Sequence, residues 1–272
     1  MQRSKQGYCP VGNNSQKHSL MMAMILAAGR GERMRPLTDR IPKPLLEAGG
    51  KPLIVWHIER LVKAGITELV INHAHLGAQI EQRLGDGSRF GAQIQYSAES
   101  SALETAGGIA NALPLLCPSR PMGDGLGMRE PFAVINGDIY CDYDFSLLHE
   151  RANALHASGD MAHLVLVDNP AHHPKGDFCL QDSRVTPDSY LLPDNSCLQL
   201  TFSGIGLYHP SLFSHIPRGS VAPLAPLLRA QIAQGKISGE RHAGVWVDVG
   251  TPQRLAELDA QLTNLLHKAT HV

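Results

Sequence analysis

The sequence predicts an α/β fold in which helices cover both faces of a mostly parallel sheet. Three observations lead to this prediction. An apolar run over residues 21–28 ends directly at Gly29, stretches with strand and helix periodicity then alternate up to residue 167, and hydrophobic residues (43%) far outnumber charged ones (18%). This balance excludes a disordered chain. A chain of 272 residues can also bury a large core without support from disulfides or metal ions.

Strands and helices alternate along the first part of the chain. The continuous apolar run over 21–28 is typical of a strand buried in a parallel sheet. The spacing of Ile54, Ile58 and Leu61 predicts a helix that stops near Gly65. The same patterns predict, in order, a strand over 69–72, a helix at 80–84, a strand at 94–96, a helix over 105–116 broken at Pro114, a strand over 132–136, a helix over 147–157 and a strand over 161–167. This alternation predicts a Rossmann-like, doubly wound sheet.

Shorter strands dominate after residue 167. The sequence predicts strands over 178–180, 198–208 and 245–249, and helices over 224–233 and 252–266, the last with a proline in its first turn. We interpret this half as a smaller, β-rich elaboration of one sheet, so residues 21–272 form a single domain. Residues 1–20 are polar and without periodicity, and we expect a disordered extension there. The Gly- and Pro-rich stretch 117–131 is expected to be an exposed excursion.

The charge and the cysteines limit the possible partners and location. Lys and Arg number 24 and Asp and Glu 25, so the chain has no overall basic field for binding nucleic acid. No apolar run approaches the roughly 18–20 residues of a membrane span. The five cysteines form no Cys-x-x-Cys pair, which disfavours a zinc ribbon and a secreted disulfide framework. We therefore expect reduced thiols and a cytoplasmic protein that binds neither nucleic acid nor membranes.

Small and basic residues follow the first strand directly. Glycines such as Gly29 and Gly31 let the backbone approach a ligand closely, and successive backbone N–H groups can bind phosphate oxygens. Arg33 and Arg35 add charged donors. The loop is neither a dinucleotide-binding fingerprint nor a Walker A loop. Taken alone, it fits a tight turn with solvated arginines equally well.

A lysine and two aspartates indicate a phosphate and metal site. Pro42 and Pro44 fix the backbone around Lys43, which aims its ammonium group. Asp138 and Asp248 each end an apolar strand, where open α/β sheets bind ligands. Mg²⁺ prefers few carboxylates together with phosphate and water. Each of these residues alone also fits a surface turn or a helix cap, so the prediction depends on their combination.

Four of these segments resemble the sugar-1-phosphate nucleotidylyltransferases: AAGRGERMRPLT, IPKPLL, VINGD and WVDVGT. The resemblance covers about residues 22–266. The stretches INHAHLGAQIEQRLGDGSRFG, LETAGGIANALPLL, LVLVDNPAHHPKGDF and LTFSGIGLYHP are similar to those of members that use UTP and N-acetylmuramate 1-phosphate in peptidoglycan recycling. The second alternative within the family is transfer of GMP to mannose 1-phosphate, or of a nucleotide to another hexose 1-phosphate.

The resemblance implies a role for each matching position. It implies a nucleotide-binding part over about 21–140, a sugar-binding part over about 141–272, and Mg²⁺ as cofactor. The implied nucleotide-binding residues are Ala28, Gly29, Gly31, Glu32, Arg33, Lys43, Glu99, Thr105, Gly107 and Asn136; the catalytic residues are Lys43, Arg33 and Asp138; the metal ligands are Asp138 and Asp248; and the sugar-binding residues are Asn169, Gly176, Asp177 and Ser203.

Two positions depart from the family pattern. Glu32 stands where the phosphate loop usually has a threonine, so a hydroxyl contact is lost. Glu104 stands where many relatives have glycine, which leaves the base specificity open.

Two other classes of protein remain as alternatives. A non-catalytic nucleotide-sugar sensor on the same fold should lack the lysine or a metal carboxylate, and this chain retains Lys43, Asp138 and Asp248. A dinucleotide-binding protein needs an acidic residue about 20 positions after the glycine loop. Glu47 lies near that position, but no strand precedes it. The enzyme is expected to be a monomer or a small homo-oligomer.

Overall fold

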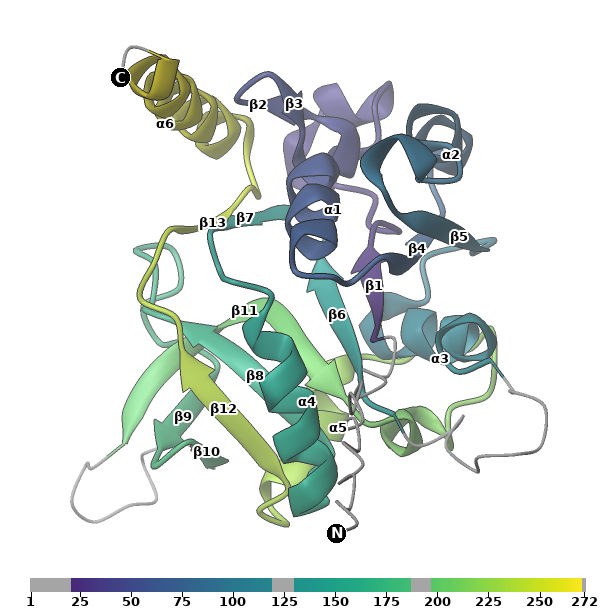
Figure 1. Ribbon diagram of the computed structural model, residues 1–272, viewed down its shortest axis with the longest axis vertical. Coiled ribbons are helices and arrows are strands. Elements are labelled where there is room, and N and C mark those ends of the chain that lie inside the picture. The colour runs from purple at the N-terminus through teal and green to yellow at the C-terminus, as the bar shows by residue number, and fades with distance from the viewer. Residues whose placement is uncertain (1–20, 119–129, 187–196, 271–272) are drawn as a thin grey trace, which may run out of the picture.

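A computed structural model describes residues 21–118, 130–186 and 197–270 of the chain (Figure 1). The predicted extension over 1–20 and most of the predicted excursion over 117–131 lie outside the described residues. The strands are β1 Met22–Leu26, β2 Glu47–Ala48, β3 Lys51–Pro52, β4 Glu68–His73, β5 Gln93–Ala98, β6 Phe132–Asn136, β7 Ile139–Cys141, β8 Ala162–Val167, β9 Phe178–Gln181, β10 Arg184–Thr186, β11 Leu198–Tyr208, β12 Ile237–Arg241 and β13 Trp246–Asp248. The α-helices are α1 Leu53–Lys63, α2 Gly77–Leu84, α3 Glu104–Leu116, α4 Leu147–Ser158, α5 Leu224–Ile232 and α6 Pro252–Thr270.

The central sheet has nine strands in the order β5-β4-β1-β6-β11-β8-β12-β10-β9. The first four of these strands are parallel, and the register places Leu26 of β1 opposite both Asn72 of β4 and Asn136 of β6. The strand order changes direction between β1 and β6. Open α/β sheets bind ligands outside the carboxyl ends of the strands at such a point. A ligand site is therefore expected at the segments that follow Leu26 and Asn136.

The second half of the sheet is mixed. Strand β11 runs antiparallel to both β6 and β8, whereas β12 returns parallel to β8. The α/β, Rossmann-like class is confirmed, as is the β-rich elaboration. The prediction of a mostly parallel sheet holds for the first half alone, because β11 reverses the direction of the chain between β6 and β8.

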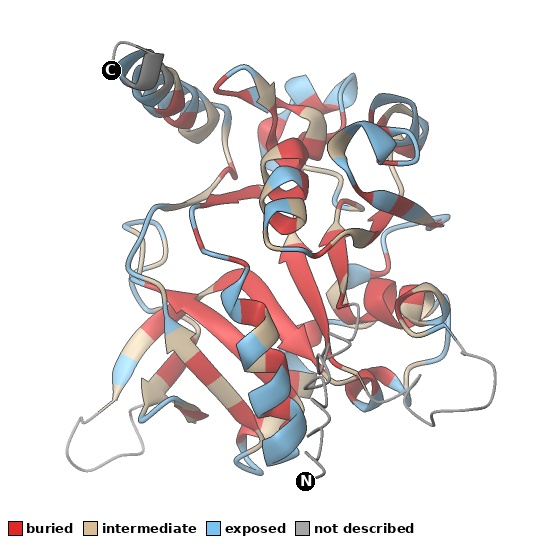
Figure 2. Cartoon of the chain, viewed as in Figure 1, coloured by how far each residue is buried: buried red, intermediate tan, exposed pale blue. Residues whose placement is uncertain are grey.

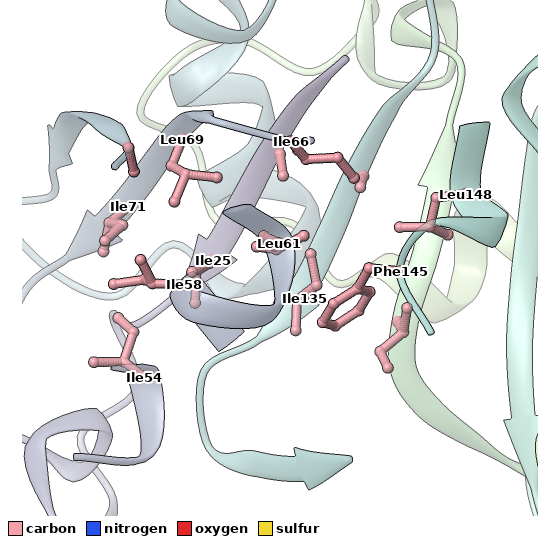
Figure 3. Packing of buried hydrophobic residues seen from close by; sticks show 14 of the residues in the cluster. Ile25, Ile54, Ile58, Leu61, Ile66, Leu69, Ile71, Ile135, Phe145 and Leu148 are labelled. Atoms are coloured by element: carbon pink, nitrogen blue, oxygen red, sulfur yellow. The ribbon is translucent and has the colours of Figure 1, made fainter. Parts of the chain in front are cut away.

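Hydrophobic clusters cover both faces of the sheet. Along β1, Ala23 and Ile25 point into one cluster and Met24 into the other, as the alternation of a strand requires. Figure 3 shows the first cluster, where Ile54 and Ile58 of α1 pack near Ile25. The second cluster includes buried residues of α3 and α5. The central strands β1, β4, β6 and β8 are consequently almost wholly buried, while the helices expose one side (Figure 2). Within the described ranges, no helix is long and apolar enough to cross a membrane.

Two local expectations were wrong or incomplete. Helix α3 continues through Pro114, because this proline lies in the last turn and removes only one helical hydrogen bond there. The sequence did not predict the strands β2, β3, β7, β10 and β12. Strand β7 pairs with β13 as a separate two-stranded antiparallel ribbon, hereafter the β7–β13 ribbon.

The expectation of reduced thiols was wrong for one pair of cysteines. Cys179 and Cys197 form a disulfide, with a Cα–Cα distance of 5.7 Å. The pairing of β9 with β11 brings these positions together, since Leu180 lies opposite Leu198. No local motif marks a bridge between residues 18 positions apart. Cys117 and Cys141 carry free thiols.

Candidate active site

A cavity of about 360 Å³ opens at the carboxyl ends of β1 and β6. The residues that line it come from the loop after β1, the Lys43 turn, the strand ends and the start of α3. They are Leu26, Ala27, Ala28, Gly29, Gly31, Glu32, Arg33, Met34, Lys43, Pro44, Asn72, Ala102, Glu104, Thr105, Asn136, Asp138 and Gly250. The structure thus brings together eight of the ten residues predicted to bind the nucleotide, Glu99 and Gly107 being the exceptions.

The loop after β1 offers backbone donors to this cavity. Asn72 Oδ1 accepts a hydrogen bond from the backbone N–H of Ala27 (2.9 Å), which fixes the start of the loop. The next four backbone N–H groups, over residues 28–31, have no hydrogen-bond acceptor within the described part of the chain. Gly31 has a φ of 69°, and a Cβ there would lie 2.9 Å from Thr38 Cγ2. A glycine is therefore needed for this turn.

The arginines of the loop have different surroundings. Arg30 donates to Thr38 O (2.8 Å) and to Asp39 Oδ1 (2.9 Å), and Arg35 also forms an ion pair with Asp39 at 2.9 Å. The hydrogen bond from Arg30 lowers the pKa of Asp39. Arg33 lines the cavity, and no ion pair engages it among the described residues. Of the two arginines predicted as phosphate donors, Arg33 is available to an anion and Arg35 is turned toward Asp39.

Lys43 and Asp138 form an ion pair at the cavity wall. Lys43 lies in a short 3₁₀ helix over Lys43–Leu45, and Asp138 lies between β6 and β7. The distance from Lys43 Nζ to Asp138 Oδ2 is 2.6 Å. The lysine side chain is 7% exposed and the aspartate 39%. The buried ammonium group of Lys43 and the partly exposed carboxylate of Asp138 therefore place a positive and a negative charge side by side at the cavity wall. The ammonium group is the part of this pair that suits a phosphate.

Asp248, the second predicted metal ligand, lies on the strand paired with the segment that carries Asp138. Asp248 ends β13 opposite Ile139 of β7, and the backbone N–H of Val249 donates to Asp138 O at 3.2 Å. Asp248 does not line the cavity itself, but Gly250 does. Asp248 Oδ2 accepts a hydrogen bond from Arg254 Nη1 at 2.7 Å. The β7–β13 ribbon therefore carries both predicted carboxylates at the same end.

The region at the start of α3 divides into lining and supporting residues. Thr105 and Glu104 line the cavity, and Glu104 has a φ of 58°, a conformation that favours glycine. Glu99 is buried: its Oε1 accepts from Asn72 Nδ2 (2.7 Å) and its Oε2 from the backbone N–H of Leu103 (3.0 Å). Glu99 thus fixes Asn72 and the turn before α3 by hydrogen bonds. It was predicted to bind the nucleotide, but it does not line the cavity.

Gly107 also has a structural role, and its contact with the nucleotide stays a prediction. Its backbone N–H donates to Ala222 O at 3.0 Å. A Cβ at this position would lie 2.3 Å from Ser220 O. The glycine is needed because another backbone segment crosses α3 there.

The four residues predicted to bind the sugar lie outside the cavity lining. Asn169 Nδ2 donates to Pro174 O (3.2 Å) and Gln199 O (3.1 Å), which fastens the loop over 168–177 to β11. In the same loop, Asp177 Oδ2 accepts from the backbone N–H of Phe202 at 2.8 Å. A Cβ on Gly176 would lie 2.6 Å from Asn169 Oδ1. These three predicted residues shape a loop, and their contact with a sugar stays a prediction.

Ser203 is placed differently from its prediction. The side chain is fully buried, and its hydroxyl group donates to Val165 O at 2.6 Å. The same oxygen accepts from the backbone N–H of Ile205 at 3.1 Å. Between Phe202 and Ile205 the register of β11 against β8 shifts, so Ser203 satisfies backbone groups at a bulge. The structure gives Ser203 this role inside the sheet in place of the predicted sugar contact.

Asn72 and Arg254 are among the residues in or next to the site that were not predicted. Asn72 lines the cavity at the end of β4, and the polar residue that interrupts an apolar strand was a usable signal. Arg254 contacts Asp248 from the first turn of α6. Nothing in the local pattern distinguishes Arg254 from a solvent-exposed helix residue, because its partner is set by the position of α6 against the β7–β13 ribbon.

Known proteins resemble the chain over nearly its whole length. An N-acetylmuramate alpha-1-phosphate uridylyltransferase from Neisseria meningitidis serogroup B is 54% identical over 244 residues, which cover 88% of this chain and 97% of that relative. A mannose-1-phosphate guanyltransferase from Hypocrea jecorina is 31% identical over 86% of this chain, and one from Xenopus laevis, beta-B, is 27% identical over 91%. The matches span 62% and 66% of those longer guanyltransferases.

Solved structures share the fold. A Bacillus anthracis protein described as a glucose-1-phosphate thymidylyltransferase, crystallised with sucrose, matches with a TM-score of 0.71 at 22% identity, over 90% of this chain and 96% of its own. HddC from Yersinia pseudotuberculosis, complexed with GMP-PN, matches with a TM-score of 0.68 at 18% identity, over 89% and 99%. Residues 22–176 also match the nucleotidyl transferase family. The chain therefore belongs to the nucleotidyl transferase family.

Proposed function

We propose that this protein transfers UMP from UTP to N-acetylmuramate 1-phosphate, forming UDP-N-acetylmuramate and pyrophosphate. The 54% identity with the Neisseria uridylyltransferase, which extends over 97% of that relative, supports the choice of donor and acceptor. The geometric observation that carries the proposal is the buried Lys43 ammonium group at 2.6 Å from Asp138, in a cavity that also presents backbone N–H groups with no acceptor among the described residues. Because the acceptor is a cell-wall sugar, we assign the reaction to peptidoglycan recycling.

The reaction is an in-line substitution at phosphorus. A phosphate oxygen of the sugar 1-phosphate forms a bond to the α-phosphorus of UTP, and the bond from that phosphorus to the β-bridging oxygen breaks to release pyrophosphate. Both reactants are anions that repel each other, so positioning and charge neutralisation supply most of the catalysis. The attacking phosphate is already ionised near neutral pH, and the step therefore needs no nucleophilic Ser, Cys or His.

Residues of the cavity fit the separate parts of this step. The backbone N–H groups over 28–31 are suited to the oxygens of the triphosphate. Arg33 supplies a cation for the outer phosphates that leave as pyrophosphate. Lys43 is buried and directed by its ion pair, so its ammonium group can offset the charge that develops at the α-phosphate.

The donor set next to Lys43 fits a magnesium ion. Asp138 and Asp248 are carboxylates at one end of the β7–β13 ribbon, and neither Oδ1 atom accepts a hydrogen bond from any described residue. Two carboxylate oxygens, completed by phosphate and water, form the ligand set that Mg²⁺ prefers. We assign both residues as its ligands. When bound, Mg²⁺ would supply positive charge to the reacting phosphates and help to orient them.

The experiment that tests the proposal measures pyrophosphate release for each pairing of four nucleoside triphosphates with N-acetylmuramate, mannose and glucose 1-phosphates. The expected result is selective turnover of UTP with N-acetylmuramate 1-phosphate, lost on chelation of divalent cations. Equal or better turnover of GTP with mannose 1-phosphate would favour the guanylyltransferase alternative. Absence of turnover together with tight binding of a nucleotide sugar would favour the non-catalytic sensor.

A further inference from the structure

We infer that Arg254 is a built-in counter-ion of Asp248, which a divalent cation must displace before it can use this carboxylate fully. The inference rests on the proposed function, since it assumes that Asp248 is a metal ligand. Arg254 Nη1 lies 2.7 Å from Asp248 Oδ2. His172 Nε2 lies 2.9 Å from the same Nη1 and 3.4 Å from the same Oδ2. Asp248 is thus held by a cation before any ligand arrives.

The surrounding backbone is shaped to hold this pair. Gly250, which lines the cavity, would place a Cβ 2.5 Å from Arg254 Nη2 and 3.1 Å from Asp248 Oδ2. A larger residue at this position would have to displace the guanidinium end of the Arg254 side chain. Thr251 Oγ1 accepts the backbone N–H of Arg254 at 3.3 Å and fixes the first turn of α6. The side chains of Arg254 and Asp248 are only 18% and 23% exposed, so solvent screens the pair weakly.

The same arrangement occurs at the other carboxylate. Asp138 Oδ2 accepts a hydrogen bond from Lys43 and Asp248 Oδ2 accepts one from Arg254, and in each case Oδ1 is without a hydrogen-bond partner among the described residues. The protein therefore neutralises both carboxylates internally. Two acidic groups at one end of a short ribbon would otherwise repel each other.

This arrangement has a consequence for the order of binding. A divalent cation that approaches the nucleotide-free site meets the positive charge of Arg254 close to its ligand, and like charges at this distance oppose binding. A triphosphate brings negative charge for both the metal and the arginine. Metal binding is thus disfavoured until the nucleotide arrives. Arg254 does not line the cavity, and we regard it as a positioning residue for Asp248.

The test uses Mn²⁺ as the probe and measures its affinity for the nucleotide-free, full-length protein by titration calorimetry and by the electron paramagnetic resonance signal of free Mn²⁺. Arg254→Met should tighten binding by roughly threefold to tenfold, because it removes one charge from a partly buried site. Arg254→Lys keeps the charge and should stay within about twofold of the parent, as the same electrostatic argument requires. Arg83→Met is the matched control, since it removes an arginine from an exposed pair with Glu47 that does not line the cavity.

Unchanged or weaker Mn²⁺ binding in a folded Arg254→Met variant would overturn the inference, because a merely structural arginine would not oppose the metal. Arg254→Gln provides a second neutral variant if the methionine variant does not fold, as judged by circular dichroism. Asp248→Asn separates this inference from the proposed function. If Asp248→Asn leaves Mn²⁺ binding unchanged, the metal assignment itself is wrong. If it weakens binding while neither neutral variant tightens it, only the role of Arg254 is wrong.

Discussion

The Nζ atom of Lys43 lies 2.6 Å from Oδ2 of Asp138, although 95 positions separate the two residues in the chain. Lys43→Met should lower kcat/KM by a factor of about 10²–10³, because it removes one donor to the negative charge that develops in the transition state. The rate of pyrophosphate release from UTP and N-acetylmuramate 1-phosphate measures this loss of kcat/KM. Lys51→Met, which breaks the exposed ion pair with Glu59, should retain the parent rate. Near-parent turnover of the Lys43 variant would contradict the assigned role.

Glu99 supports the cavity from within, and its loss should affect both stability and nucleotide binding. Glu99→Ala leaves two buried donors, Asn72 Nδ2 and the Leu103 N–H, without their acceptor. The free energy of unfolding should fall by about 2–6 kcal/mol, because each of the two unsatisfied buried donors costs about 1–3 kcal/mol. Urea unfolding measures this loss, and calorimetry should show weaker UTP binding, since Asn72 holds the loop at Ala27. A variant as stable as the parent would be inconsistent with this network.

Glu104 occupies a backbone conformation that costs free energy for any residue with a Cβ. Its φ is 58° at the first position of α3. Glu104→Gly should therefore be more stable than Glu104→Ala by about 1 kcal/mol, although alanine is ordinarily the better helix former. Thermal unfolding of the two variants under identical conditions gives the comparison. The reverse order of stability would show that the left-handed conformation is not retained in solution.

His57 should make stability depend on pH between about 4 and 6.5. Burial lowers the pKa of this histidine from 6.5 to about 4. Within that range the unfolded chain binds a proton that the folded protein excludes, so stability is lost as the pH falls from 6.5 toward 4. The loss from this group amounts to about 3 kcal/mol at most.

A substitution isolates the contribution of His57 from those of other titrating groups. His57 Nε2 lies 2.8 Å from Ile139 O. In His57→Gln, the glutamine amide can donate to the same carbonyl without titrating. Urea unfolding at several pH values should show a shallower dependence in this variant than in the parent. Equal slopes in the two proteins would mean that His57 does not titrate with a lowered pKa.

The disulfide between Cys179 and Cys197 predicts a defined thiol count. Reduction of the denatured parent should expose two additional thiols to a colorimetric reagent. Reduction of Cys197→Ser should expose none. If the parent protein, isolated without reductant, also shows no additional thiols after reduction, these two cysteines are already reduced in solution, as the sequence alone predicted.

Much of the cavity could be predicted because many of its residues follow strands directly or lie in short distinctive motifs. Gly29, Lys43 and Asp138 lie in or next to short motifs whose chemistry is legible locally, and the parallel order of β1, β4 and β6 brings their ends to one edge. Residues such as Glu99 and Ser203 were assigned to ligands because sequence does not reveal which polar groups are consumed by the backbone. The partnership of Arg254 with Asp248 depends on the packing of a distant helix, which no local pattern encodes.

The β7–β13 ribbon has a mechanical consequence. Asp138 directly precedes β7 and Asp248 is the last residue of β13, so both lie at one end of the ribbon, and the Val249 N–H to Asp138 O bond joins the two segments there. His57 anchors the same ribbon to α1 through Ile139. A displacement of this ribbon would move both carboxylates together. Their distance from a substrate would then change while the distance between the two carboxylates stayed the same.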